Sequence, residues 1–318
     1  MEKDSELKLL RPRSLAAVVS DGYRLYLGCF RPLFRSSWIV AVVYGLTFAL
    51  MMGYVVNNVM PMQVTMTTFG LNDSALVTKT MALYTVTTLL FSLAALLLAA
   101  QALRAFNEHK TSDTISRPQH WYGRLCLPWF GRLLMNELWM VVLSAIIGLV
   151  FTGVVYAILS LGVVGNVWKS IASLAVLAVL IILTLALLLP LCYTVMRSLL
   201  DKKFQWRPPV KGYVTGLRHW GLLFATVLVT GIITGLLSVV CELPAVIMGV
   251  ANMKAYAGMA IGDPLGLPEH IVPLTYFVFA IAGFIQAYVH LSSLFPIYYA
   301  YGSIEQQEAE RVKIDIEH

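Results

Sequence analysis

The stretch that decides the fold is SIASLAVLAVLIILTLALLL, residues 170–189. It holds no charged side chain, and the uncharged run continues to residue 196. A bilayer core about 30 Å thick is crossed by roughly 20 apolar residues in a helix. Inside lipid the backbone must satisfy its own hydrogen bonds, so a continuous run of this kind predicts a transmembrane helix.

The same reasoning identifies further spans along the chain. Six stretches have the required length and apolar character: 38–60, 81–103, 138–161, 168–196, 220–243 and 271–300. None of them alternates at the period of two that a membrane barrel needs. We therefore expect an all-α, polytopic integral membrane protein with six transmembrane helices, which forms a single membrane domain over residues 1–318.

The overall composition supports this class. Of the 318 residues, 58% are hydrophobic and 13% are charged, and the mean hydropathy is +0.75. Soluble domains carry roughly a quarter charged residues, so a globular cytosolic enzyme is disfavoured. The formal net charge of +6 is not interpreted as a nucleic-acid surface, because in a membrane protein the location of charge matters more than its sum.

The basic residues predict the orientation of the helices. Of the 23 Lys and Arg residues, 20 lie in the N-terminal arm, in alternate connections or in the C-terminal tail. The exceptions are Lys79, Lys169 and Lys254, one in each of the other connections. Since basic loops are retained in the cytoplasm, we expect a multi-pass protein of the cell inner membrane with both termini cytoplasmic.

Two charge clusters of similar pattern close the second and fourth predicted spans. RAFNEHK at 104–110 and RSLLDKK at 197–203 each place an acidic residue four positions after an arginine, where the two can pair on one helix face. The sixth span closes with YGSIEQQ, in which Glu305 follows Tyr301 by four residues. An Arg-Pro pair recurs at residues 11, 117 and 207, ahead of each odd-numbered span.

These recurrences predict three pseudo-repeated hairpins, each preceded by an amphipathic interfacial helix. Their approximate bounds are 1–110, 111–203 and 204–307, with a short cytoplasmic tail at 308–318. In the segment 14–35 the charged and apolar residues fall on different helix faces, which suits a helix lying in the headgroup plane and bent at Pro32. Such a segment serves either as a platform for lipid headgroups or a partner, or as a structural elbow.

The pattern resembles the membrane domain fused to some bacterial glycerophosphoryl diester phosphodiesterases, and its stand-alone relatives. The resemblance rests on the repeated amphipathic helix and hairpin, and on the ending FPIYYAYGSIEQQEAE at 295–310. It implies a bacterial polytopic inner-membrane protein. It does not imply phosphodiesterase activity, which belongs to a separate barrel domain with acidic metal ligands.

Polar residues inside the predicted spans are the candidates for a ligand or pathway site, because polar groups are expensive within a bilayer. In the sixth span these are Gln286, His290 and Ser293, spaced so that they share a helix face. They serve either a polar ligand or proton relay, or a hydrogen-bonded clasp between helices.

The fifth span carries a second set, spaced every four residues: Thr226, Thr230, Thr234, Ser238 and Glu242. Gly231 and Gly235 beside it match the small-residue spacing of close helix packing. The hydroxyls can bond the carbonyl four residues earlier in the same helix, so the stripe needs no ligand, and it serves either close helix packing or a pathway. Glu242 lies near the outer end, where it either lines a vestibule with Asn57 and Asn58 or simply meets water.

No motif assigns chemistry to the chain. The connection after the second span contains Glu108, His109, Asp113, His120 and Cys126, whose spacing matches no zinc pattern. The four cysteines lie in or beside apolar stretches and predict buried thiols. Nucleophile elbows and phosphate-binding glycine loops are absent from the sequence. We expect no catalytic residues, no cofactor, no metal and no enzyme activity.

The sequence therefore favours a non-enzymatic inner-membrane scaffold, or an accessory subunit of a membrane complex. The alternative is a transporter or a lipid- or amphiphile-handling protein with a polar intramembrane site on the fifth and sixth helices. Membrane lipids are the expected partners, together with a possible membrane-protein partner, and nucleic acid is not expected.

Overall fold

The computed structural model describes residues 8–69, 74–112, 127–160, 167–200, 212–260 and 270–317, together with residues 262 and 268. Its elements, all helical within those residues, are α2 (Leu15–Tyr54), the π-helix η1 (Val55–Val59), α3 (Met60–Phe69), α4 (Ser74–Ser112), α5 (Leu127–Ser160), α6 (Val167–Leu200), α7 (Tyr213–Arg218), α8 (Trp220–Ala260) and α9 (Ile271–Glu317). The expected all-α class is confirmed.

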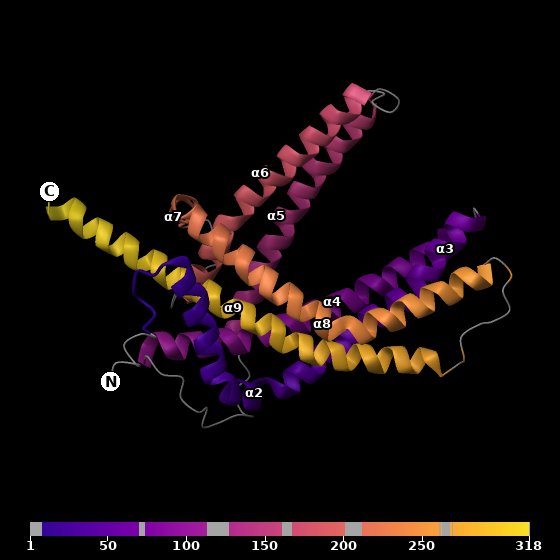
Figure 1. Ribbon diagram of the computed structural model, residues 1–318, viewed down its shortest axis with the longest axis horizontal. Coiled ribbons are helices and arrows are strands. Elements are labelled where there is room, and N and C mark those ends of the chain that lie inside the picture. Colours follow the sequence, from indigo (N-terminus) through magenta and orange to yellow (C-terminus); the bar gives the residue numbers. More distant parts are fainter. Residues whose placement is uncertain are drawn as a thin grey trace.

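The first long helix begins earlier than the predicted span. Ser14 caps α2 by accepting a hydrogen bond from the Ala17 amide, and the helix then runs without a break through Pro32. Proline lacks the amide hydrogen that would bond the preceding turn, so it bends a helix that it interrupts. Figure 1 shows α2 changing direction along its length. Residues 15–35 are therefore the first part of the long helix rather than a separate element.

Five helical stretches are long and apolar enough to cross a bilayer. They are residues 15–63 through α2, η1 and the start of α3, then α4, α5, α8 and α9. The described apolar part of α6, Leu187–Leu200, is shorter than a full span. The long apolar helices are those expected of a multi-pass membrane protein, and a sixth crossing remains a prediction.

The helices α2, α4, α8 and α9 form the body of the molecule, with α9 as the main packing partner of α2. The two helices run antiparallel and approach closely at small residues. A β-carbon added at Gly45 would lie 2.7 Å from the Ala280 carbonyl oxygen, and one at Gly22 would lie 2.7 Å from the Pro296 backbone. Glycine therefore sets the distance between the two helix axes.

The buried face of the first part of α2 differs from the two faces that the sequence distinguishes. Val18, Gly22, Leu25, Cys29 and Leu33 are buried in the helix contact, at helical spacing. The predicted apolar face is more open, and Leu27 upon it is exposed. The segment therefore has three faces, because one packs against protein while the charged and apolar faces stay outside.

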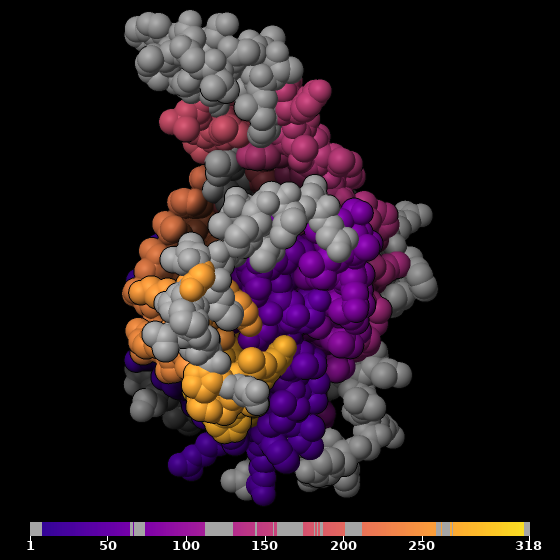
Figure 2. Space-filling model, turned by 90° about the vertical axis from the view of Figure 1, so that its right-hand side faces the viewer, coloured from indigo at the N-terminus to yellow at the C-terminus, as the bar shows by residue number. Residues whose placement is uncertain are grey.

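The hairpin of α5 and α6 projects away from the body. Figure 1 shows its tip far from the other helix ends, and Figure 2 shows the hairpin standing beyond the bulk of the molecule. In the most apolar window of α5 only 12% of the residues are buried, against 39% in the windows of α2 and α9. The three predicted hairpins thus have unequal surroundings, and their repetition stays a prediction.

Candidate functional site

A group of polar side chains joins α2, α8 and α9, and we call it the polar seam. Its members are Tyr23 of α2, Thr230, Thr234 and Ser238 of α8, and Gln286 and His290 of α9. All of them except Tyr23 belong to the polar sets that the sequence predicts for the fifth and sixth spans.

Gln286 connects the two long C-terminal helices. Its side chain is 3% exposed, and its Nε2 donates a 2.6 Å hydrogen bond to the hydroxyl of Ser238. The same nitrogen lies 3.0 Å from Nε2 of His290. With the amide in this orientation its nitrogen donates, so Nε2 of His290 accepts and the ring carries its proton on Nδ1. The predicted clasp between helices is therefore present.

The amide oxygen of Gln286 has a different environment. It is buried and has no hydrogen-bond partner among the described residues. Exchanging the oxygen and nitrogen of the amide would leave the NH₂ group in that position instead. In both orientations one polar group of a buried amide is unpaired, and such a group costs about 1–3 kcal/mol.

The threonine stripe of α8 differs from threonines elsewhere in the chain. Thr226, Thr230 and Thr234 are buried, but their hydroxyls make no bond to their own helix or to any other described residue. Elsewhere the local bond does form, as from Thr152 to the Gly148 carbonyl and from Thr184 to the Leu180 carbonyl. These three hydroxyls therefore do not use the local bond that their spacing allows.

Tyr23 brings α2 into the seam, which the sequence does not predict. Its side chain interacts with Thr234 of α8, yet within the described chain neither oxygen has a hydrogen-bond partner of acceptable geometry. In the sequence, Tyr23 is one tyrosine in an otherwise charged segment, and no motif marks it as a site residue. Without the packing of α2 against α9, nothing in the sequence places it near α8.

The remaining predicted site residues lie outside the seam. Ser293 donates its hydroxyl hydrogen to the His290 carbonyl oxygen at 2.7 Å, so it is satisfied within α9. Glu242 is half-buried one turn beyond Ser238, and no hydrogen bond joins it to Gln286. His290 is exposed on the surface of α9, so the seam opens there toward the surroundings of the protein.

The small residues of α8 were predicted to pack closely, and this prediction was wrong. A β-carbon added at Gly231 or at Gly235 would meet no atom within 4 Å. Both glycines are exposed, on a different face from the buried threonines. The close approach occurs instead between α2 and α9.

The C-terminal part of α9 forms a second polar assembly with α6. Tyr193 donates its hydroxyl hydrogen to Glu305 Oε1 at 2.7 Å, and Arg197 Nε lies 3.6 Å from the same oxygen. Arg197 thus pairs with the acid of the last helix, while its expected partner Asp201 lies outside the described residues. The equivalent pair in α4, Arg104 with Glu108, forms within one helix at 3.4 Å as expected.

Glu308, one turn further along α9, holds α7. Its carboxylate accepts hydrogen bonds from Arg218 at 3.1 Å and lies 3.0 Å from Nε2 of His219. The segment 295–310, on which the family resemblance rests, therefore contacts several other elements. Four of its side chains are fully buried: Phe295, Tyr298, Tyr299 and Ile304. Its contacts reach α4, α6, α7 and the N-terminal arm.

Arg13 makes several polar contacts in the part of that arm that the structure describes. Its Nε donates to Asp21 at 2.9 Å, other guanidinium nitrogens donate to the carbonyls of Lys8 and Leu9, and its carbon lies 4.6 Å from the centre of the Tyr299 ring. The Arg13 amide donates to Ser303 at 3.0 Å. Sequence reasoning missed it, because one arginine among seven basic residues of an arm resembles a solvated charge.

The possible metal ligands of the second connection do not assemble in the part of the chain that the structure describes. No group of three such side chains occurs there. His109 is buried, and its Nδ1 lies 3.1 Å from the Tyr298 hydroxyl. Asp113, His120 and Cys126 lie outside the described residues.

No protein-family model, curated protein or solved structure matches the chain. The helices define the class, a protein with several helices long and apolar enough to cross a membrane.

Proposed function

We propose that the protein handles an amphiphile within a bacterial inner membrane, and that the amphiphile places its polar group in the seam between α2, α8 and α9. The observation that carries the proposal is the set of buried polar atoms from three helices that lack partners in the described chain: the Tyr23 hydroxyl, three threonine hydroxyls of α8 and the Gln286 oxygen. Buried polar groups are almost always hydrogen-bonded in native proteins.

The chemistry of the seam indicates an uncharged polar group. Hydroxyls donate and accept, the Gln286 oxygen accepts, and the His290 ring nitrogen donates or accepts according to its tautomer. A hydroxyl, ester or amide headgroup satisfies such atoms, whereas a naked ion would lack a countercharge in the seam. His290 is exposed on α9, so a ligand held in the bilayer can enter sideways and keep its apolar chain in lipid.

The test compares lipids retained by purified variants. The wild-type protein should retain one amphiphile far above its abundance in the membrane, as measured by native mass spectrometry. Gln286→Leu and His290→Leu should each lower its occupancy about tenfold, the equivalent of one hydrogen bond of roughly 1.4 kcal/mol.

A further test variant removes a hydroxyl from α8, and its matched control removes a hydroxyl from α6. Thr234→Val should weaken retention, whereas Thr184→Val should leave it unchanged, because Thr184 is satisfied by the Leu180 carbonyl in its own helix. Wild-type retention in both Gln286→Leu and Thr234→Val would contradict an amphiphile site in the seam.

A second candidate function is that of a non-enzymatic scaffold or accessory subunit. It is favoured by the α5–α6 hairpin, which extends from the body with Leu149 74% exposed. A photo-crosslinker at Leu149 should then give one discrete protein adduct in native membranes. Adducts with lipid alone would contradict this role for the hairpin.

A further inference from the structure

The unpaired polar atoms of the polar seam, and of Thr226 beside it on α8, are closed off from their surroundings. Thr226 is fully buried, Thr230 is 2% exposed and Gln286 is 3% exposed. Neither their unpaired oxygens nor those of Tyr23 and Thr234 have surface that a water molecule can reach, and none has a hydrogen-bond partner among the described residues. An occupant can therefore reach these atoms only if the helices around them separate.

The closed arrangement is disfavoured by the same atoms. Buried polar groups are almost always hydrogen-bonded, because a group that loses its water partners and gains no others raises the free energy of the folded state. When the helices separate, water or a ligand can bond each of these oxygens. Other contacts must therefore hold the seam closed, and the helix with the weakest packing is the one expected to move.

Of the three helices of the seam, α8 is the least enclosed. In its most apolar window 17% of the residues are buried, against 39% in the windows of α2 and α9. Its glycines give it no close contact there either, since a β-carbon added at Gly221, Gly231 or Gly235 would meet no atom within 4 Å. α8 can therefore shift with a smaller loss of packing than α2 or α9.

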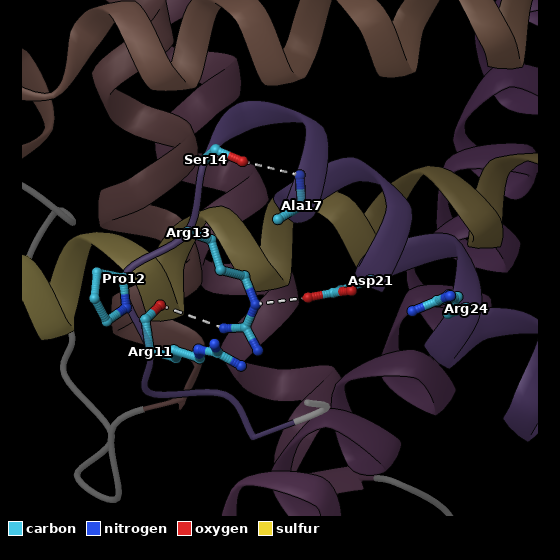
Figure 3. A pocket seen from close by; sticks show the side chains of 7 residues that line it. All are labelled: Arg11, Pro12, Arg13, Ser14, Ala17, Asp21 and Arg24. Carbon is cyan, nitrogen blue, oxygen red and sulfur yellow. Dashed lines mark hydrogen bonds and ion pairs between the residues drawn. The ribbon is translucent and has the colours of Figure 1, made fainter. Parts of the chain in front are cut away.

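α2 and α9, by contrast, are fixed to each other along their lengths. Gly22 and Gly45 of α2 lie against the backbone of α9, and the N-terminal arm joins the same two helices. Arg13 bonds Asp21 of α2 at 2.9 Å, while its amide donates to Ser303 of α9 at 3.0 Å. Figure 3 shows the Arg13 guanidinium facing Asp21 at the start of α2. These two helices therefore form the static wall of the seam.

A hydrogen bond between α8 and α9 lies within the seam itself. It is the 2.6 Å bond from the Gln286 amide nitrogen to the Ser238 hydroxyl. Toward the C-terminal end of α8, Asn252 donates to Thr275 of α9 at 3.1 Å. At the other end His219, the residue before α8, lies 3.0 Å from a carboxylate oxygen of α9. Both ends of α8 are thus tied to α9, and breaking the central bond frees the middle of the helix while the ends hold.

We propose that the described polar seam is a closed state, and that the middle of α8 moves away from α9 when the bond between Gln286 and Ser238 breaks. The movement exposes the threonine hydroxyls and admits the occupant. This inference rests on the proposed function for the identity of the occupant, whereas the movement itself needs no ligand.

The experiment measures how often buried positions open, by the reaction of single cysteines with a maleimide. It uses the full chain purified in detergent, with its four native cysteines replaced by alanine. Thr230→Cys reports on the seam, and Ser37→Cys is the reference, because Ser37 is fully buried in α2 and lies against Tyr288 of α9. Burial in apolar surroundings disfavours the reactive thiolate, so each labelling rate follows the open population.

Ser238→Ala removes the central bond and should raise the labelling rate of Thr230→Cys about tenfold, the factor that corresponds to one hydrogen bond. The labelling rate of Ser37→Cys should not change. Ser293→Ala is the matched control and should leave both rates unchanged, because the Ser293 hydroxyl bonds the His290 carbonyl within α9. An unchanged rate at Thr230→Cys in the Ser238→Ala background, or an equal increase at Ser37→Cys, would overturn the proposal.

Thr234→Cys, one turn further along α8, is a second reporter with the same expected response, so the result does not depend on the folding of one variant. The labelling assay contains no added lipid, which separates this proposal from the proposed function. Faster labelling in a protein that retains no amphiphile would support the movement and contradict the amphiphile site. Retention of an amphiphile by the wild type, without faster labelling of either reporter in Ser238→Ala, would support the site and overturn the movement.

Discussion

At the scale of single residues, Arg13 shows how a charge can be buried at the edge of a membrane protein. Its guanidinium is compensated by the Asp21 carboxylate, by main-chain carbonyls and by the face of Tyr299. Breaking a buried ion pair by removing one partner typically destabilises by about 3–5 kcal/mol, since the other charge stays buried and uncompensated. The arm therefore depends on this one side chain.

Replacing Arg13 by alanine should lower the free energy of unfolding by several kcal/mol, on the order of 3. Arg13→Lys should recover only part of the loss, because an ammonium cannot bond the carboxylate and the carbonyls in the same plane. Unfolding in detergent by a graded denaturant measures both. Arg31→Ala, which removes an exposed arginine of α2, is the control and should change stability little. An equally large decrease in the free energy of unfolding for Arg31→Ala would contradict this prediction.

The residues of the polar seam show what sequence can predict at this scale. Gln286 and His290 were predicted as a pair because they lie one turn apart, and their contact is confirmed at 3.0 Å. The unpaired state of Thr230 was not predictable, because a threonine hydroxyl can turn to its own helix or away from it. Which rotamer wins depends on the neighbouring helix, and that information is tertiary.

At the scale of the elements, the contact of α2 with α9 depends on glycine at the crossing. A β-carbon at Gly45 would lie within 3 Å of the backbone of α9, at the Ala280 oxygen and the Phe284 nitrogen. Neither atom can move without shifting the helix. The two helices must therefore separate to admit even one methyl group.

Gly45→Ala should destabilise the protein by about 1–3 kcal/mol, the usual penalty for overpacking. Gly235→Ala is the matched control, because its β-carbon would meet open space. Alanine is the better helix former by up to about 1 kcal/mol, so the control should be neutral or slightly stabilising. Unfolding curves of the two variants decide the matter, and a neutral Gly45→Ala would show that the helices can yield.

Hydropathy predicted where the long helices lie, because a span has to be continuous and apolar whatever its neighbours are. It could not predict that α2 starts at Leu15, since the charged residues of that segment favoured a separate surface helix. Close packing at Gly231 and Gly235 was also inferred from spacing alone. Small residues permit close packing, but which helix uses them is decided by the complete assembly.

At the scale of the whole molecule, the open question is whether the α5–α6 hairpin crosses the bilayer. Figure 1 shows the outer ends of α3 and α8 on one side of the molecule, with the tip of the hairpin apart from them. Six spans with cytoplasmic termini require residue 169, at that tip, to share a side with Lys79 and Lys254. A five-span or re-entrant arrangement does not require these three residues to lie on one side of the bilayer.

Single cysteines in a cysteine-free background should distinguish these arrangements in intact cells. We expect cysteine at Lys79, Lys169 and Lys254 to react with a membrane-impermeant maleimide, and cysteine at Lys110 and Glu310 to react only after the membrane is opened. Protection of residue 169 together with labelling of residues 79 and 254 would show that neither α5 nor α6 crosses the bilayer, and would leave the rest of the topology intact.

Because α2 packs mainly against α9, the last helix, most of its contacts can form only late in biosynthesis. Ile271 leaves the ribosome more than 200 residues after Tyr54, an interval of roughly 10–40 s at ordinary rates of translation. Throughout it the first helix sits in the translocon or its vicinity without the surface that covers Tyr26 and Ser37, which bond to Tyr288. A nascent chain interrupted before α9 would thus lack the main packing partner of α2 and be open to quality-control proteolysis.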